Sequence, residues 1–222
     1  MRYEIKYDIE NFKNQNQIFD LIKSHPVGFN QIFYTRRINN IYFDYENYSN
    51  YFENIEGEKQ RKKYRIRWYG DTFGICQKPV FEIKTKIGPL GSKDKLDIKE
   101  FILTDRNKIY NQFDQLFYKE DENWFLIKSK ILKPTLLNSY VRSYFASSDK
   151  NFRITVDKNV NFFNYSSNDF ISQNSFTKYN SIIMEIKFDQ KFYNQINLIS
   201  NYFPFRISKS SKYVIGLQKF YN

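Results

Sequence analysis

Hydrophobic and polar residues alternate along two neighbouring stretches of the chain, residues 60–70 and 79–86. Such an alternation predicts β-strands, because successive side chains of a strand point to opposite sides of the sheet. One face of the two predicted strands carries five cations and one carboxylate: Lys63, Arg65, Arg67, Glu82, Lys84 and Lys86. Lys and Glu are depleted in strands, and like charges this dense repel one another. The pattern therefore predicts an anionic ligand among these side chains.

Most of the remaining chain divides into strands and helices by the same reasoning. Alternation predicts further strands over residues 2–9, 31–45, 136–146, 152–160 and 179–188. Apolar residues at helical spacing predict helices over 14–24, 106–118 and 190–202, and a short helix or turn over 47–55. Composition predicts loops over 88–95, which is rich in Gly and Pro, and over 161–180, which is rich in Asn and Ser. No linker separates these elements, so we expect a single α+β domain over residues 1–222.

The composition is that of a globular protein with a strong positive charge. The 222 residues are 41% hydrophobic, and the formal net charge is +11. A positive surplus of this size favours polyanionic partners, namely nucleic acid, phosphate chains or acidic lipid. The charge alone does not choose among the three.

The chain contains one cysteine and one histidine, Cys76 and His25. A single thiol excludes an internal disulfide framework and a Cys-rich zinc site. We expect Cys76 to be partly exposed in a turn and His25 to lie near a helix end, with no part in a catalytic triad or a multi-histidine metal site. The chain opens without the apolar run of a signal peptide, and no stretch approaches 18 apolar residues, so we expect a cytoplasmic protein.

The polar faces of the predicted strands share one property, which is a concentration of charged side chains. These are Glu4, Lys6, Arg65, Arg67, Glu82, Lys84, Arg142, Arg153 and Glu185. A solvated face of an antiparallel sheet is the commonest arrangement of this kind. If the sheet instead closes on itself, these faces line one lumen. Arginine forks in that lumen would bind phosphate oxygens, and the carboxylates would hold a hard divalent metal.

Several segments, in order along nearly the whole chain, carry a resemblance to a known family: residues 2–6, 64–70, 81–84, 140–142, 152–157, 184–187 and 209–213. The most specific are Arg-Ile-Arg-Trp-Tyr-Gly at 65–70 and Lys-Ser-Ser-Lys at 209–212. Together they resemble the VTC domain, the catalytic domain of the vacuolar transporter chaperone polyphosphate polymerases, which belongs to the triphosphate tunnel metalloenzymes. The resemblance implies an α+β fold whose antiparallel closed β-barrel, of about eight strands, forms a tunnel with helices packed outside.

The resemblance also implies roles for individual residues. The implied catalytic cations are Arg65, Arg67, Lys84, Arg142, Arg153, Lys209 and Lys212. The implied further substrate contacts are Lys6, Tyr140, Ser211 and either Lys93 or Lys95. Glu185 would hold the metal ion, with Glu4 and Glu82 assisting through water.

The activity implied is transfer of the γ-phosphate of ATP onto a growing inorganic polyphosphate chain, with Mn²⁺ or Mg²⁺ as cofactor. Export of the product would need a separate membrane partner, which would place the protein at the inner face of a membrane. Two alternatives on the same site stay open, hydrolysis of tripolyphosphate or nucleoside triphosphates and a non-catalytic polyphosphate-binding subunit. Nucleic-acid binding is disfavoured, because the aromatic residues mostly fall on the face opposite the charges, whereas a base-stacking platform needs both together.

Overall fold

The computed structural model describes residues 2–10, 15–88, 90–104, 112, 115–118, 122–129, 131–165, 171 and 176–221. The strands in this part of the chain are β1 (Arg2–Ile9), β2 (Asn30–Asp44), β3 (Gln60–Tyr69), β4 (Gly74–Cys76), β5 (Val80–Ile87), β6 (Leu90–Asp97), β7 (Phe101–Leu103), β8 (Lys133–Ala146), β9 (Phe152–Asn164), β10 (Phe176–Tyr179), β11 (Ile182–Asp189) and β12 (Ile207–Ser208). The helices are α1 (Gln15–Lys23), α2 (Ser49–Glu56), α4 (Glu122–Lys128), the 3₁₀-helix η1 (Gln190–Gln195), α5 (Ile196–Ser200) and α6 (Lys212–Tyr221).

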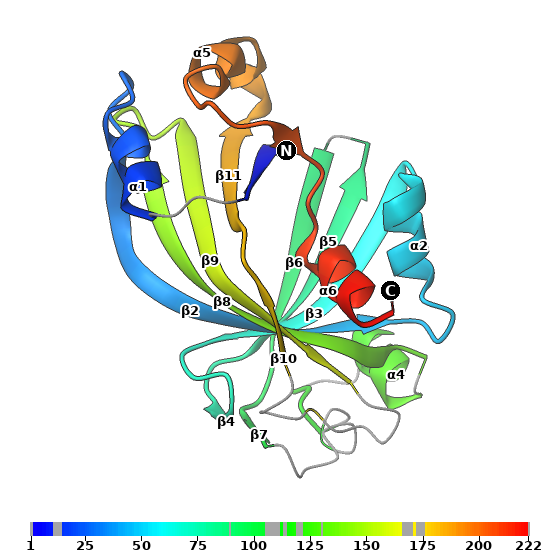
Figure 1. Cartoon of the computed structure of the whole chain (residues 1–222). Coiled ribbons are helices and arrows are strands. Elements are labelled where there is room, and N and C mark those ends of the chain that lie inside the picture. The colour runs from blue at the N-terminus through cyan, green and yellow to red at the C-terminus, as the bar shows by residue number, and fades with distance from the viewer. Residues whose placement is uncertain are drawn as a thin grey trace.

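One large antiparallel sheet dominates the described residues. Its strand order is β10-β9-β11-β1-β6-β5-β3-β2-β8, with β12 on β1 and a further pairing of β8 with β9. The strands curve around a common interior, with α1 beside β2 on one flank and α2 beside β3 on the other (Figure 1). A separate small sheet joins β4 to β7.

The expected closed barrel is wrong, because the sheet is open between β1 and β6. These two strands pair only at Arg2 and Gly91. A strand has two edges, and β11 occupies one edge of β1 along its whole length. At Lys6 and Tyr7 the other edge is occupied by β12, so β6 has no main-chain groups of β1 left to pair with there. The segment that follows β12 therefore enters the structure at the opening between β1 and β6.

The alternation in the sequence sorts side chains to the two faces of the sheet. On β3, Tyr64, Ile66 and Trp68 are buried in a hydrophobic core on the outer face. A second core on that face packs α1 and α5 against β1, β9 and β11. The inner face of β3 carries Arg65 and Arg67 instead, and these line a cavity. The period of two thus separates an apolar outer face from a charged inner face.

Helix α6 packs on the inner face of the sheet. Its Tyr213 and Leu217 join Tyr42 and Tyr140 in a third buried cluster. Tyr42 lies opposite Arg65 in the β2–β3 register, and side chains of paired residues share a face. Helix α6 therefore bounds the cavity at the end where this cluster lies.

Most predicted elements are confirmed. The strands expected over 2–9, 31–45, 60–70, 79–86, 136–146 and 152–160 are β1, β2, β3, β5, β8 and β9. Within the described residues, the helix expected over 14–24 is α1, the short helix over 47–55 is α2, and the helix over 190–202 is η1 followed by α5. The stretch 179–188 is divided, since β10 ends at Tyr179 and β11 begins at Ile182.

Both predicted loops are wrong in part. Most of residues 88–95 belongs to β6, whose side chains are mainly exposed and polar. This strand is held by main-chain pairing with β5 rather than by burial of an apolar face, so its hydrophobic pattern does not identify it. In the stretch 161–180, β9 continues to Asn164 and pairs there with β10. The helix expected over 106–118 lies largely outside the described residues.

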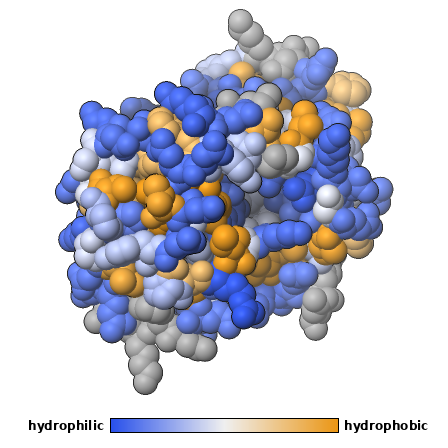
Figure 2. Space-filling model, turned by 90° about the horizontal axis from the view of Figure 1, so that it is seen from above, coloured by the Kyte–Doolittle hydropathy of each residue, from blue (hydrophilic) through white to orange (hydrophobic). Residues whose placement is uncertain are grey.

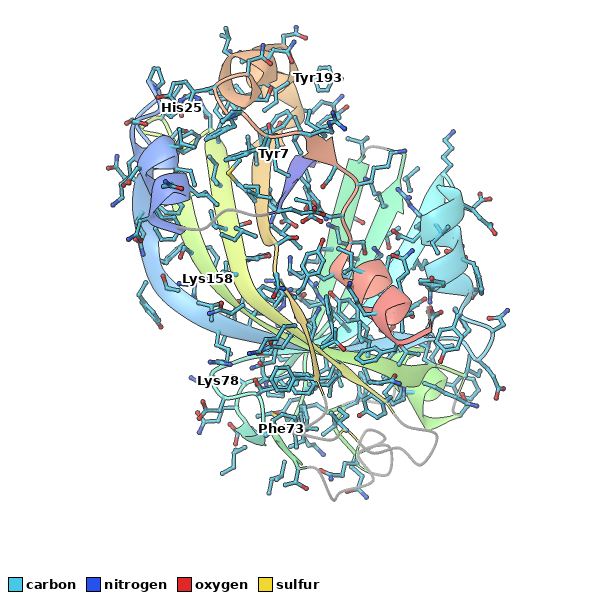
Figure 3. The ribbon with its side chains drawn as sticks, in the orientation of Figure 1. Tyr7, His25, Phe73, Lys78, Lys158 and Tyr193 are labelled. Atoms are coloured by element: carbon cyan, nitrogen blue, oxygen red, sulfur yellow. The ribbon has the colours of Figure 1, made fainter. Side chains whose placement is uncertain are left out.

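The single cysteine and the single histidine are both buried. Cys76 has no exposed surface, so the expectation of a partly exposed thiol is wrong, and burial raises the pKa of Cys76 to about 12. His25 follows the end of α1, as expected, and its Nε2 lies 3.2 Å from the carbonyl oxygen of Ile199. Figure 3 shows His25 near α1 and Tyr7 on β1. The side chains of Cys76 and His25 are therefore both enclosed in the interior of the protein.

The surface seen from above is mostly hydrophilic, with hydrophobic residues scattered among the polar ones (Figure 2). None of the helices in the described ranges combines the length and the apolar character needed to cross a membrane.

The close packing of α6 gives a test of the fold. A methyl group on Gly216 would lie 2.7 Å from Cδ1 of Phe162 and closer still to Cδ2 of Leu136. Gly→Ala in a helix interior normally stabilises by roughly 1 kcal/mol. Here we expect Gly216→Ala to lower the free energy of unfolding by about 1–3 kcal/mol, because the core has no room for the methyl group. Urea denaturation measures this, with the exposed Gln218→Ala on the same helix as the control. Stabilisation by Gly216→Ala would contradict the inward packing of α6.

Candidate functional site

The inner faces of the curved sheet enclose a cavity of about 590 Å³. Among the described residues, nine cationic side chains and two carboxylates line it: Lys6, Lys63, Arg65, Arg67, Lys84, Lys93, Arg142, Lys187 and Lys212, with Glu4 and Glu185. Tyr42, Tyr140 and Ser211 add hydroxyl groups. The residues come from strands far apart in the sequence, and the sheet brings them together because their side chains share one face.

Most of the predicted site residues lie in this cavity. They are Lys6, Arg65, Arg67, Lys84, Tyr140, Arg142, Ser211 and Lys212, with the carboxylates Glu4 and Glu185. Three predicted cations do not line it, namely Lys95, Arg153 and Lys209, all of which are exposed. Glu82 does not line it either, because its carboxylate is buried beneath the arginines, with a residue exposure of 3%.

Sequence reasoning gave no site role to Tyr42, Lys63, Lys187 and Asp157. Lys63 shares the alternation of Arg65 and Arg67, and Lys187 shares that of Glu185. Parity along the strands was therefore sufficient to find both. Lys93 was left open against Lys95, because the segment around it was taken for a loop without a register.

Glu82 holds three cations of the cavity wall at once. Its Oε2 accepts hydrogen bonds from Arg65, at 2.8 Å from Nε and 2.7 Å from Nη2, and lies 3.6 Å from Nη1 of Arg67. Its other oxygen contacts the ammonium of Lys93. Burial alone would raise the pKa of Glu82, but Arg65, Arg67 and Lys93 lower it to about 2. This carboxylate is therefore a counter-ion that fixes the spacing of the cations.

On the opposite wall, the buried carboxylate of Asp157 holds two cations in place, Arg142 and Lys212. Its two oxygens accept a bidentate pair of hydrogen bonds from Arg142, at 2.5 Å and 2.6 Å. The ammonium of Lys212 lies 2.5 Å from Oδ2. Burial would raise the pKa of Asp157, but the charges of Arg142 and Lys212 hold it below its usual range. A fork–fork pair fixes the plane of the guanidinium as well as its position, so Arg142 is presented to the cavity in one orientation.

Among the residues that the structure describes, Glu4 and Glu185 are the carboxylates that face the cavity. In the β1–β11 register Glu4 lies opposite Lys187 and Lys6 lies opposite Glu185, so the two carboxylates are diagonal neighbours. Glu185 lies 2.8 Å from the ammonium of Lys187 and 3.4 Å from that of Lys6, and Glu4 lies 2.8 Å from that of Lys84. Burial would raise the pKa of Glu4, but Lys84 and its other cationic neighbours lower it to about 2. Both carboxylates are therefore ionised at neutral pH, since the pKa of Glu185 is also lowered against the effect of burial, chiefly by Lys187.

This donor set fits a divalent metal that is held partly by substrate. No cluster of three or more His, Cys, Asp or Glu side chains suited to a metal ion occurs in the part of the chain that the structure describes. Mg²⁺ commonly needs only one or two carboxylates, with waters and substrate phosphates as its other ligands. Glu4 and Glu185 satisfy that requirement.

Cations outnumber carboxylates in the described lining of the cavity. Together with burial, this excess lowers the pKa values of Lys63 and Lys93. Burial, with the nearby charges of Lys6 and Lys84, lowers the pKa of Lys63 well below its usual range. Its ammonium donates to Oγ of Ser211 at 2.8 Å. Burial and the charges of Arg65 and Arg67 lower the pKa of Lys93 to about 7, although Glu82 opposes them. A bound anion would favour the charged form of each lysine.

Tyr140 lies between the two walls of the cavity. Its hydroxyl accepts a hydrogen bond from Nη2 of Arg67 at 3.2 Å, and the ammonium of Lys212 lies 4.7 Å from the centre of its ring. Burial alone would raise the pKa of Tyr140, but the charges of Arg142, Arg67 and Lys212 lower it to about 8. The phenol is therefore a good donor toward an anionic oxygen in the cavity.

Solved structures of three other proteins share this fold. They are proposed adenylate cyclases from Vibrio parahaemolyticus (13% identity, TM-score 0.52, 96% of this chain and 97% of that chain) and Bacillus halodurans (12%, 0.54, 100% and 98%), and a proposed adenylyl cyclase from Hippeastrum described as having a dominant triphosphatase activity (13%, 0.53, 99% and 96%). At such low identity the likeness shows the fold alone.

The sequence comparison is more specific than the fold. A family model of the VTC domain matches residues 1–221. The chain therefore belongs to the VTC domain family, and the resemblance noted in its sequence is confirmed. No curated protein matches the chain at the sequence level.

The counter-ion role of Glu82 predicts a pH-dependent loss of stability. Its pKa is about 2 in the folded protein and about 4.3 in an unfolded chain. A lowered pKa contributes stability above pH 4.3, and that contribution disappears as the pH falls toward 2. We expect Glu82→Gln to lower the free energy of unfolding by about 3 kcal/mol at pH 7 and by progressively less below pH 4. Urea denaturation across this range measures the difference.

The control for Glu82→Gln is Glu46→Gln. Glu46 also pairs with a lysine, Lys133, but its side chain is 84% exposed. Exposed ion pairs contribute little to stability, so this variant should unfold as the wild type does. Equal stability losses in the two variants would contradict the role given to Glu82.

Proposed function

We propose that this protein transfers the γ-phosphate of ATP onto the end of an inorganic polyphosphate chain, with Mn²⁺ or Mg²⁺ as cofactor. The observation that carries the proposal is the cavity of about 590 Å³, whose described lining has nine cationic side chains and two carboxylates. Its excess of positive charge suits a ligand with many negative charges in a row. Membership of the VTC domain family supports the choice of phosphate chains over other polyanions.

The proposed work of the cations is positioning and charge stabilisation. Phosphoryl transfer passes through a loose transition state that has little covalent chemistry for a protein to perform. Arg65, Arg67 and Arg142 are held by Glu82 and Asp157 before any ligand arrives. Fixed donors of this kind need no reorganisation when negative charge develops on the oxygens of the transferred group.

The nucleophile in this proposal is the terminal phosphate of the polyphosphate chain. Its oxygens are ionised at neutral pH, so the reaction needs no general base. The described lining of the cavity accordingly includes neither histidine nor cysteine. Tyr140 and Ser211 would donate hydrogen bonds that orient the phosphates between the arginines and Lys212.

Glu185 and Glu4 are proposed to hold the metal ion, which would neutralise charge on phosphate oxygens of the substrate. The ammonium groups of Lys6, Lys84 and Lys187 pair with these two carboxylates. With the metal ion bound to the carboxylates, the three lysines would bind phosphate oxygens instead. Glu82 keeps a supporting role in this arrangement, because it is already shared among three cations.

The exposed predicted cations have a different proposed role. Lys95, Arg153 and Lys209 lie outside the cavity, where they would attract and guide a polyanionic chain rather than touch the reacting phosphate. A membrane partner at the inner face of a membrane, needed if the product is exported, also stays a proposal.

The proposal predicts a product that can be seen directly. Purified protein incubated with ATP and Mn²⁺ should form polyphosphate, detected on a stained gel, as ATP is consumed. Release of free phosphate without polyphosphate would instead support hydrolysis, the activity described for the Hippeastrum protein. Binding of polyphosphate without consumption of ATP would support a non-catalytic subunit.

Arg65 and Lys62 point to opposite faces of β3, so variants at these two positions compare the cavity with the surface. Arg65→Ala should lower the rate of ATP consumption at least about tenfold, because it removes a charge-assisted phosphate contact worth roughly 1.5–3 kcal/mol. The control is Lys62→Ala, whose side chain is exposed and has the opposite parity on β3. If Lys62→Ala slows the reaction as much as Arg65→Ala, the inner face of β3 is not the reactive one.

The metal role of Glu185 predicts opposite effects on activity and on binding. Glu185→Gln should lower the metal-dependent activity by orders of magnitude, because a hard divalent cation needs the carboxylate charge. Binding of tripolyphosphate in EDTA should be kept or strengthened, because the variant removes a negative charge from the cavity. Calorimetric titration measures the binding. Normal activity at normal Mn²⁺ concentrations would exclude Glu185 as a ligand.

A further inference from the structure

A cluster of aromatic rings around Arg36 lies outside the set of residues that the proposed phosphate transfer uses. The guanidinium carbon of Arg36 lies 4.9 Å from the ring centre of Tyr144, 5.1 Å from Tyr69, 5.3 Å from Phe33 and 5.4 Å from Tyr34. Three of these rings are exposed, Phe33 by 52%, Tyr34 by 75% and Tyr69 by 47%. We call these five residues the Arg36 cluster.

The register of the sheet places the Arg36 cluster directly beside the phosphate-binding arginines. Tyr69 follows Arg67 by two positions on β3, and Tyr144 follows Arg142 by two positions on β8, so each shares the face of its arginine. Arg36 lies opposite Arg142 in the pairing of β2 with β8. The exposed rings thus continue the inner face one step beyond the charged cavity.

A β-bulge builds the cluster. Between the pairs Phe33–Tyr144 and Arg36–Arg142, β2 advances three residues while β8 advances two. An extra residue of this kind bends the strand and re-aims its side chains, which is common beside active sites. Here it places Phe33, Tyr34 and Arg36 around one point. Nε of Arg36 is buried without a hydrogen-bond partner among the described residues.

A phosphate chain does not stack on aromatic rings, but the base of a nucleoside does. Purine bases stack on the faces of aromatic side chains and on guanidinium planes. We infer that the Arg36 cluster binds the adenine base of ATP, so that the triphosphate runs from there past Arg67 and Arg142 into the cavity. This assignment rests on the proposed function and adds the end of the cavity at which the nucleotide enters.

An aromatic surface could equally be covered by another protein chain. Two features favour a nucleotide: the continuity of the rings with the arginines of the cavity, and the guanidinium that sits among them. A protein partner would need neither. Loss of an aromatic ring should therefore affect a ligand with a base and leave a ligand of phosphates alone unaffected.

The test compares ATP with tripolyphosphate on the same variants. Tyr34→Ala and Tyr69→Ala should each weaken ATP binding about tenfold, as expected for the loss of one stacking ring, and leave tripolyphosphate binding within about twofold of wild type, since no phosphate contact is removed. Calorimetric titrations in EDTA avoid metal-dependent turnover. Tyr34→Phe and Tyr69→Phe should restore ATP binding, because each keeps the ring.

The matched control is Tyr118→Ala. Tyr118 is also an exposed tyrosine, at 67%, whose ring lies 5.9 Å from a cation, the ammonium of Lys99, but it is not part of the Arg36 cluster. It should change the binding of neither ligand. Equal weakening of ATP and tripolyphosphate, or no weakening of either, in the two cluster variants would overturn the inference and leave the proposed phosphate transfer standing. If the wild-type protein binds neither ligand, both proposals fail.

Discussion

The sharing of a few buried carboxylates among many cations is the interaction on which this structure depends. Glu82 contacts Arg65, Arg67 and Lys93, and Asp157 contacts Arg142 and Lys212. A carboxylate in such a place cannot be removed without leaving buried charge uncompensated, which costs several kcal/mol. Because each carboxylate is divided among two or three cations, the guanidiniums are held in place while the cavity keeps its positive excess. That excess is the property available for binding phosphate.

The fold makes this arrangement tolerable by separating two kinds of packing. Large hydrophobic cores lie on the outer face of the sheet, with Trp68 and Phe81 among their fully buried side chains, so the inner face is free to carry charge. The chain then returns to that face near its end, where β12 pairs with β1 and α6 packs against Tyr42 and Tyr140. This return brings Ser211 and Lys212 to a cavity otherwise built by the strands.

The sequence predicted those parts of the site that follow from alternation within one strand. Arg65, Arg67, Arg142 and Glu185 were found because each lies in a strand with a clear apolar face. Closure of the sheet was mispredicted, because competition between β12 and β6 for the edge of β1 involves segments far apart in the chain. The choice between Lys93 and Lys95 stayed open for a related reason, since β6 buries few side chains and is specified by pairing with β5.

The central claim is that the cavity is a specific site for a row of phosphates and that its cations repel one another until such a ligand binds. The most direct measurement is the free energy of unfolding, by urea denaturation, as tripolyphosphate is added at constant ionic strength. Specific binding to the folded protein predicts a rise of about 1.4 kcal/mol for each tenfold increase in ligand above its dissociation constant. Sodium chloride at the same ionic strength should give a much smaller effect. Equal stabilisation by the two salts would contradict the account, because it would mean that the charges are merely screened.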